Sequence, residues 1–324
     1  MKVPRRQFLH LAAGAAAIPA VSRFAWAQAY PTRPVRMIVN LAPGGALDFT
    51  ARIIGDRLSR SLGRQIVVEN KSGAGGMLGA ETVAKSPPDG YTLLATGDVV
   101  ASAPHIMSLN VDYLRGLIPV IELVHASIVL AAHTSLGANS IADLIRIAKA
   151  RSSIGYATSG AGTAQHFVGE WFARLAGIKL EHVPYRGAGQ AINDLIAGHV
   201  LLAVLAPATL IPHYKAGKLR LLAQTTKARS PSLPEVPTFE QAGVNGLVLD
   251  SWVGKFAPAK TPATIVARLN TEMDIALTDP VIRARFLEAA LEPVGGSVEQ
   301  FSARIREDNE KYARLAKELR IRLE

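Results

Sequence analysis

The stretch Val35-Arg36-Met37-Ile38-Val39-Asn40-Leu41-Ala42-Pro43-Gly44-Gly45 decides the fold class of this 324-residue chain more than any other part of it. Its first five residues are apolar apart from Arg36, which predicts a strand over 35–39. Beyond the glycine pair, apolar residues recur every three or four positions up to Gly63, which predicts a helix: Leu47, Ala51, Ile54, Leu58 and Leu62. A strand, a glycine loop and a helix in this order form the repeating unit of a parallel sheet.

Short strands and helices alternate in the same way along the rest of the chain. The predicted strands cover 66–68, 91–95, 120–123, 128–132, 154–157, 180–183, 200–205, 219–224 and 248–256. Helical patterns lie between most of them, and the last one begins with a capping box at Ser297 and Gln300. Further helix starts are predicted at Ser140, at Thr238 for a short helix, and at Thr261-Pro262. The alternation indicates an α/β protein with mostly parallel strands.

The amino terminus has the three-part layout of an export signal. Residues 1–29 contain four cations and no acid, an apolar run follows over 9–18, and Ala25-Trp26-Ala27 provides a cleavage site. The apolar run is shorter than the roughly 20 residues that span a bilayer. Arg5-Arg6 also fits a twin-arginine signal, although general secretion uses similar residues. We therefore expect residues 1–27 to be a signal peptide and the mature chain to be periplasmic.

The mature chain is expected to form two domains. Removal of 27 residues from 324 leaves 297, more than one compact core usually holds. Chain crossings are expected near 124–128 and 248–254, which gives a first domain of residues 28–125 plus 252–324 and a second domain of residues 126–251. A monomer is the simplest expectation.

Composition excludes several classes of function. The net charge of +10 falls to +6 without the four cations of residues 1–29, which suits a small anionic ligand and equally well a merely soluble surface. No Lys/Arg run with interleaved aromatics predicts nucleic-acid binding. The chain contains no cysteine, which excludes disulfides, thiolate nucleophiles and cysteine-held metal clusters.

Three glycine-rich loops, at 41–48, 96–99 and 159–163, each lie between a predicted strand and a predicted helix. A helix N-terminus offers unpaired backbone N–H groups, and glycine lets an anion approach them. No nucleotide-binding glycine motif is present, so no cofactor is expected. His166 and Glu170 have metal-ligand spacing but lack a third ligand. Ser159 and His166 leave open an exported hydrolase, although no Gly-x-Ser-x-Gly elbow occurs.

Taken together, seven segments resemble the Bug-type solute-binding proteins of tripartite tricarboxylate transporters. They occur in family order along the mature chain: Tyr30-Pro31-Thr32-Arg33-Pro34-Val35, Pro43-Gly44-Gly45-Ala46-Leu47-Asp48, Val67-Val68-Glu69-Asn70-Lys71-Ser72-Gly73-Ala74-Gly75-Gly76, Pro88-Asp89-Gly90-Tyr91-Thr92-Leu93, Ser159-Gly160-Ala161-Gly162-Thr163, His182-Val183-Pro184-Tyr185-Arg186-Gly187 and Ala216-Gly217-Lys218-Leu219-Arg220. Each segment alone is a weak signal, whereas the set is specific.

The resemblance implies a periplasmic-binding-protein fold of two α/β domains, joined by two crossover strands, that close on a carboxylate. It implies no enzymatic activity, and it implies inner-membrane transporter subunits as partners. A sensor that presents its ligand to a receptor stays open as an alternative. The ligand-binding residues that the resemblance implies are Leu41, Gly44, Gly45, Asp48, Thr96, Gly97, Ser159, Gly162, Thr163, His166, Tyr185, Arg186, Gly187 and Leu205.

The sequence departs from the family pattern on one strand of the second domain. Leu201 and Leu205 stand where the family usually has acids, the second of which commonly faces the ligand. Asp98 and Lys255 stand where small or apolar residues are more usual. These departures predict a carboxylate with an apolar or aromatic body rather than an amino acid.

Overall fold

The structure, a computed structural model, describes residues 30–109 and 111–323. The predicted signal peptide lies outside the described residues. The chain divides into two units, residues 1–32 and 33–324. Of the first unit, residues 30–32 are described, and the Tyr30–Pro31 peptide bond is cis. All elements below belong to the second unit. In the described part of the chain, no helix is both long and apolar enough to cross a membrane.

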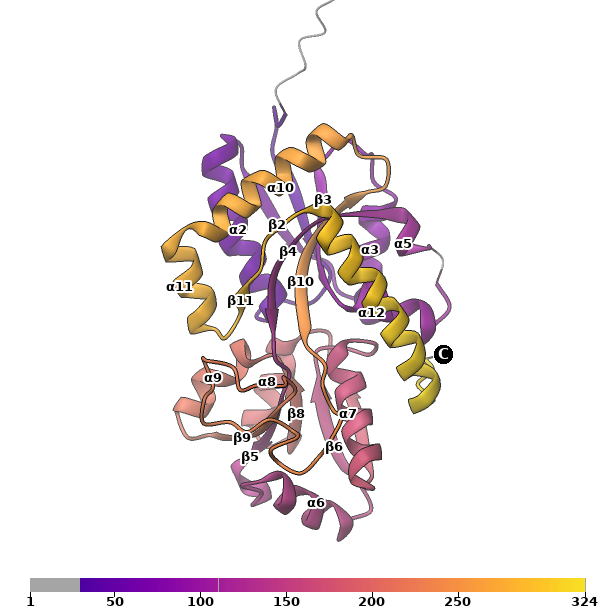
Figure 1. Cartoon of the computed structure of the whole chain (residues 1–324), viewed down its shortest axis with the longest axis vertical. Helices are drawn as coiled ribbons and strands as arrows, with labels where there is room; N and C mark the ends of the chain where they lie inside the picture. The colour runs from indigo at the N-terminus through magenta and orange to yellow at the C-terminus, as the bar shows by residue number, and fades with distance from the viewer. Residues whose placement is uncertain (1–29, 110, 324) are drawn as a thin grey trace, which may run out of the picture. The chain divides into compact units, whose positions relative to one another are not determined.

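The first of two sheets has six strands in the order β11-β4-β10-β3-β1-β2 (Figure 1). Strands β1, β2 and β3 run parallel, β10 pairs antiparallel with both β3 and β4, and β11 pairs antiparallel with β4. Their bounds are β1 Val35–Val39, β2 Ile66–Asn70, β3 Thr92–Gly97, β4 Leu117–Ala126, β10 Ser251–Pro258 and β11 Glu292–Pro293.

Helices cover both faces of the first sheet. On one face α2 (Ala46–Leu62) lies over β1 and β2, and α10 (Ala263–Thr278) lies over β4 and against α2. On the other face, side chains of α3 (Met77–Ala84), α4 (Val99–Ser102) and α12 (Val298–Leu319) share one core with Ile38 and Trp252. Short α5 (Tyr113–Gly116) precedes β4, and α11 (Pro280–Glu288) precedes β11.

The second sheet has five strands in the order β7-β6-β8-β5-β9. Helices α6 (Ile141–Lys149) and α7 (Ala164–Ala176) bury their apolar sides on one face, and α8 (Ala188–Ile196) and α9 (Pro207–Lys215) do so on the other. The strand bounds are β5 Val129–His133, β6 Ile154–Thr158, β7 Leu180–Pro184, β8 Leu202–Leu205 and β9 Leu219–Gln224.

The chain passes from the first sheet to the second between β4 and β5, and it returns through the irregular segment 225–250 into β10. Helix α12 reaches both sheets. Its Phe301 packs against Trp252 of the first sheet, and its Tyr312 packs against Phe167 of α7, with ring centroids 4.9 Å apart. Figure 1 shows α12 running from the level of the first sheet toward α7.

The predicted α/β fold is confirmed, as is the capping box at Ser297 and Gln300. Two predicted helix starts are wrong. Thr238 accepts a bond from the Gln241 amide within a turn that does not continue as a helix. Helix α10 begins after Pro262 as its N-cap, because the hydroxyl of Thr261 donates to the Pro258 carbonyl instead. Helix α9 was not predicted, since Pro212 interrupts its pattern.

Candidate functional site

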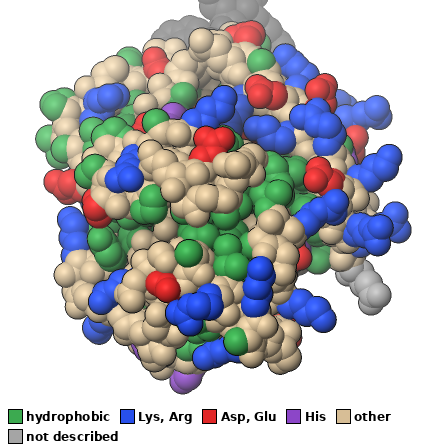
Figure 2. Space-filling model, turned by 60° about the horizontal axis from the view of Figure 1, so that its bottom comes forward, with side chains coloured by type: hydrophobic (Ala, Val, Ile, Leu, Met, Phe, Trp, Pro, Cys, Tyr) green, Lys and Arg blue, Asp and Glu red, His purple; other side chains and the backbone are tan. Residues whose placement is uncertain are grey.

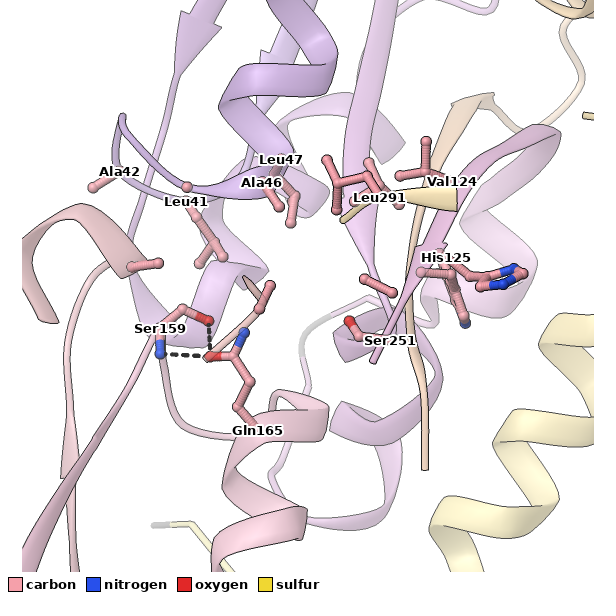
Figure 3. Close-up of a pocket in the computed structure, with 16 residues that line it drawn as sticks. Leu41, Ala42, Ala46, Leu47, Val124, His125, Ser159, Gln165, Ser251 and Leu291 are labelled. Carbon is pink, nitrogen blue, oxygen red and sulfur yellow. Dashed lines mark hydrogen bonds between the residues drawn. The ribbon is translucent and has the colours of Figure 1, made fainter. Parts of the chain in front are cut away.

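A cavity of about 40 Å³ lies between the two sheets (Figure 3). This volume exceeds the roughly 10–15 Å³ that one water molecule requires. The lining residues come from the ends of β4 and β10, from the loop before α2, from helix starts around the second sheet, and from the chain before β11: Leu41, Ala42, Gly45, Ala46, Leu47, Val124, His125, Ala126, Ser159, Gln165, Ala188, Ala206, Ser251, Trp252, Val253 and Leu291.

Four helices begin at this cavity, and none of their N-cap residues makes a side-chain capping bond, although the Asp98 carboxylate accepts the first-turn Ala164 amide of α7. Their N-cap residues are Gly45 for α2, Thr163 for α7, Gly187 for α8 and Ala206 for α9. Helices α6, α11 and α12 begin elsewhere and are each capped by the side chain of a Ser or Asp, whereas α3 and α10 also begin without a side-chain cap. Uncapped first-turn N–H groups and the positive end of each helix dipole favour an anion. The site therefore offers several N–H donors without a lining Lys or Arg.

Large apolar side chains form much of the cavity wall. Leu41, Leu47, Val253 and Leu291 line it from different elements, and Trp252 of β10 also contributes to the lining. The indole of Trp252 is fixed because its Nε1 donates to Asp308 Oδ2 at 2.7 Å. In Figure 3 the imidazole of His125 points away from the other labelled side chains, and it pairs with Glu292 at 3.2 Å. The wall suits the apolar body of a ligand.

The predicted serine and histidine pair does not form a nucleophile and base. Ser159 Oγ donates to Gln165 Oε1 at 2.7 Å, and Gln165 also accepts the Ser159 amide. His166 Nδ1 instead accepts the Gly162 amide at 3.3 Å, and its ring stacks on His182. Burial lowers the pKa of His166 to about 4. The hydrolase alternative is therefore wrong, because the serine hydroxyl is engaged by an amide rather than by a base.

The spacing of His166 and Glu170 does not produce a metal site either. Glu170 Oε1 accepts the Tyr156 hydroxyl at 2.7 Å, so both candidate ligands are engaged within the second sheet's core. Among residues 30–109 and 111–323 no cluster of three His, Asp or Glu side chains could hold a metal ion.

The structure brings three of the residues proposed from sequence, Leu41, Gly45 and Ser159, to the cavity wall. Thr163 and Gly187 are N-caps of helices that begin beside it. Tyr185 and Arg186 line a separate hollow of about 410 Å³, shared with Leu41.

The other proposed residues lie around the cavity rather than on its wall. Asp48 accepts the Gly44 amide and pairs with Arg52 at 2.9 Å, and these bonds help to keep its pKa low although burial opposes them. Thr96 Oγ1 accepts Asn40 Nδ2 at 2.8 Å, and Gly97 lies against the Trp252 carbonyl. Gly162 lies against Ile106.

Leu205 lies fully buried in the core beneath α8 and α9, away from the cavity. Ala206, the next residue, lines the cavity in its place. Sequence reasoning missed Ala206 and Leu291 because neither belongs to a glycine loop. It also missed Gln165, although a polar residue in the first turn after a glycine loop is a usable signal.

Asp98 connects the two sheets beside the cavity. It follows β3, and its carboxylate accepts the Ala164 amide at the start of α7 at 2.8 Å and the Ser251 hydroxyl at 2.6 Å. The Ser102 hydroxyl donates to the Gly162 carbonyl, and the Ala42 amide donates to the Arg186 carbonyl at 2.8 Å. Burial raises the pKa of Asp98 to about 6, although its two hydrogen-bond donors oppose the rise.

The Asp98→Asn variant is expected to lose part of the pH dependence of stability. Between about pH 4 and pH 6 the folded protein keeps a proton on Asp98 that the unfolded chain has released, so stability falls as pH rises through this window. The fall amounts to at most about 3 kcal/mol, and the variant should lack it. Urea unfolding of both proteins at pH 4, 5, 6 and 7 measures the difference. Parallel pH profiles would contradict the assignment.

Three comparisons with known proteins show what this chain is similar to. The family model described as "Tripartite tricarboxylate transporter family receptor" matches residues 50–321. Protein BugT of Bordetella pertussis is 32% identical over 304 residues, which cover 92% of each chain.

Two solved structures share the fold and carry ligands. R. palustris Rpa4515 with adipate superposes with a TM-score of 0.88 at 33% identity over 90% of this chain and 99% of its own. MatC from Rhodopseudomonas palustris with bound malate gives a TM-score of 0.83 at 27% identity, over 88% of this chain and 99% of its own. Both ligands are small carboxylates.

Proposed function

The chain belongs to the tripartite tricarboxylate transporter receptor family, and we propose that it captures a small carboxylate. We further propose that it delivers this ligand to a tripartite tricarboxylate uptake system. The family consists of solute-binding proteins and not of enzymes. The cavity between the two sheets is the proposed site of capture.

The observation that carries this proposal is the convergence of four helix N-termini on one cavity, three of which, those of α2, α8 and α9, have no side-chain cap. A carboxylate has four acceptor lone pairs and a full negative charge, which suits several N–H donors at once. Helix dipoles supply the opposite partial charge without a buried cation at the wall. The resemblance to proteins solved with adipate and malate supports the same ligand class.

We propose that the ligand has an apolar body. The apolar wall residues Leu41, Leu47, Val253 and Leu291 support an apolar ligand body. Leu205, from which the sequence predicted such a ligand, lies in the core and does not line the cavity. The polar groups at the wall are few, and Ser159 and Gln165 already bond to each other. An acid with an aliphatic or aromatic chain fits these surroundings better than a heavily hydroxylated acid.

Capture is proposed to involve two lobes that close on the ligand. The first lobe corresponds to residues 28–125 plus 252–324 and the second to residues 126–251. The hydrogen bonds of Asp98, Ser102 and Ala42 cross between the sheets, so opening would break them. Residues 127–128 and the segment leading into β10 are the proposed hinges.

The remaining elements of the proposal concern location and partners. Removal of residues 1–27 on export would place the mature chain in the periplasm, as a monomer that meets the inner-membrane subunits of the transporter. Figure 2 shows more Lys and Arg than Asp and Glu on the face that carries the second sheet, which would attract anionic solutes.

A thermal-shift panel tests the proposed function directly. The mature protein is mixed with aliphatic and aromatic mono- and dicarboxylates, including adipate, hexanoate, malate and benzoate. At least one acid should raise the melting temperature in proportion to the logarithm of its concentration, by mass action on the folded state. The corresponding amides serve as uncharged controls and should give no shift. Equal shifts with acids and amides, or none with any acid, would refute carboxylate capture.

A further inference from the structure

Lys255 of β10 is a buried cation without a partner. Its side chain is fully buried, and its Nζ makes no hydrogen bond to any of the described residues. A buried polar group normally has a hydrogen-bond partner, and a buried charge is normally paired. A lysine in this position therefore destabilises the fold, and a role outside folding would explain its presence.

The strand geometry places Lys255 next to the cavity wall. Trp252 and Phe256 of β10 share the core beside α12, and a Cβ on Gly254 would meet the ring of Phe301. Side chains alternate along a strand, so Val253 and Lys255 face the opposite side, which α2 and α10 cover.

Val253 lines the cavity, and Lys255 lies two residues further along the same face, about 7 Å away. The neighbouring strand leaves room for the lysine chain, because Val253 pairs with Gly97 and Lys255 pairs with Ala95. Leu47 covers the pair of Val253 and Gly97, since its Cδ1 lies 3.8 Å from the position that an added Cβ on Gly97 would occupy. Lys255 thus stands directly behind the apolar wall.

No acid in the surroundings compensates the charge of Lys255. Glu122 of β4 is paired with Gly254 and so lies on the opposite face, beside Arg304. Asp48 of α2 is paired with Arg52. Burial is the cause of the lowered pKa of Lys255, and no other charged group contributes to it. The remaining charged or titratable groups on the elements around β10 are Asp98, His125, Asp56, Arg57, Arg60, Glu81, Arg268, Glu272 and Asp274.

We propose that Lys255 is the buried counter-charge for the bound carboxylate and that it takes up a proton when the anion enters the cavity. The inference rests on the proposed function and deepens it. At an effective dielectric constant of about 20, a positive charge about 10 Å from an anion would favour binding on the order of tenfold. Lys255 attracts the carboxylate electrostatically from behind the wall and does not touch it. The N–H groups at the helix N-termini make the direct contacts with the ligand.

The protonation behaviour follows from the environment. Burial lowers the pKa of Lys255 to about 7, so the amine of the free protein is mostly neutral at pH 8. A bound anion raises this pKa, so binding near pH 8 takes up on the order of half a proton, and affinity falls about fivefold between pH 7 and pH 9. Asp98, with its pKa of about 6, is already ionised throughout this range.

Titration calorimetry with adipate, or with the panel acid that proves to bind most tightly, tests the proposal. Wild type, Lys255→Met and Lys227→Gln are titrated at pH 7, 8 and 9 in buffers of different ionisation enthalpy, which gives the number of protons taken up. Lys255→Met keeps the length of the chain and is expected to raise the melting temperature, because it removes an unpaired buried amine. Lys227 is exposed and provides a matched loss of charge.

The wild type and Lys227→Gln should take up protons and lose affinity as pH rises. Lys255→Met should bind about five- to tenfold more weakly at pH 7, with no proton uptake and no such pH dependence. A His125→Gln variant should still take up protons, which identifies Lys255 rather than His125 as their acceptor. Binding by Lys255→Met with unchanged affinity and proton uptake overturns the inference and leaves the proposed function standing. No binding of any panel acid by the wild type overturns both.

Discussion

The Gly45→Val variant is expected to bind its carboxylate at least 100-fold more weakly than the wild type while folding normally. Gly45 is the N-cap of α2 in an extended conformation, with φ −99° and ψ 177°, which valine adopts without strain. An added Cβ would lie 3.4 Å from Ala188 Cβ and 3.8 Å from the Ala188 nitrogen, both ordinary contacts. The two further methyl groups would occupy the space before the first turns of α2 and α8.

The loss of affinity is expected to be large because the valine methyl groups replace several charge-assisted hydrogen bonds at once. Each such bond contributes about 1.5–3 kcal/mol, so loss of two exceeds a hundredfold in affinity. Calorimetric titration with the tightest acid of the panel measures the effect, and circular dichroism checks the fold.

Ala263→Val provides the matched control, since it adds the same methyl groups at an exposed first-turn position of α10 away from the cavity. Undiminished affinity in Gly45→Val would show that the anion does not bind at the start of α2.

Replacement of Asp308 by alanine is expected to lower the free energy of unfolding by about 3–5 kcal/mol, the range for breaking a buried charged network. The carboxylate is 3% exposed, and it accepts the Trp252 indole at 2.7 Å and Arg304 Nε at 2.9 Å. Alanine would leave the indole N–H buried without an acceptor. Arg304 would keep Asp250 as its remaining partner at 2.9 Å.

Urea unfolding at neutral pH measures this effect. Asp56→Ala is the control, because Asp56 pairs with Arg60 on the exposed face of α2 and such pairs contribute less than about 1 kcal/mol. Since Trp252 forms part of the cavity wall, Asp308→Ala should also weaken carboxylate binding. A stability loss no larger than that of Asp56→Ala would show that Trp252 and Arg304 find other partners.

Several features of the fold were predictable because neighbouring residues encode them. The strand β1, the helix α2 and the glycine pair between them follow from hydrophobic spacing and from two residues without side chains. The capping box of α12 is likewise a local pattern, since its two side chains are three residues apart. The short helix expected at Thr238 failed because one local hydrogen bond suffices for a turn but not for a helix.

The candidate site was only partly accessible to the same reasoning. The loops that carry Leu41, Gly45 and Ser159 were visible as glycine patterns. Ala188, Ala206 and Leu291 were not, because small and apolar residues at these positions have no distinctive spacing. Leu205 was expected at the ligand from family resemblance, yet the alternation of β8 turns it into the core beneath α8 and α9.

The sequence by itself determined the α/β alternation, the glycine loops before the helices and the absence of cysteine chemistry, because each depends on composition or on residues a few positions apart. Only the tertiary structure decided that four helices begin at one cavity, that Asp98 bonds to α7 and Ser251, and that Lys255 lies behind the wall without an acid. These properties depend on contacts between segments 60 to 160 residues apart, which sequence spacing does not encode.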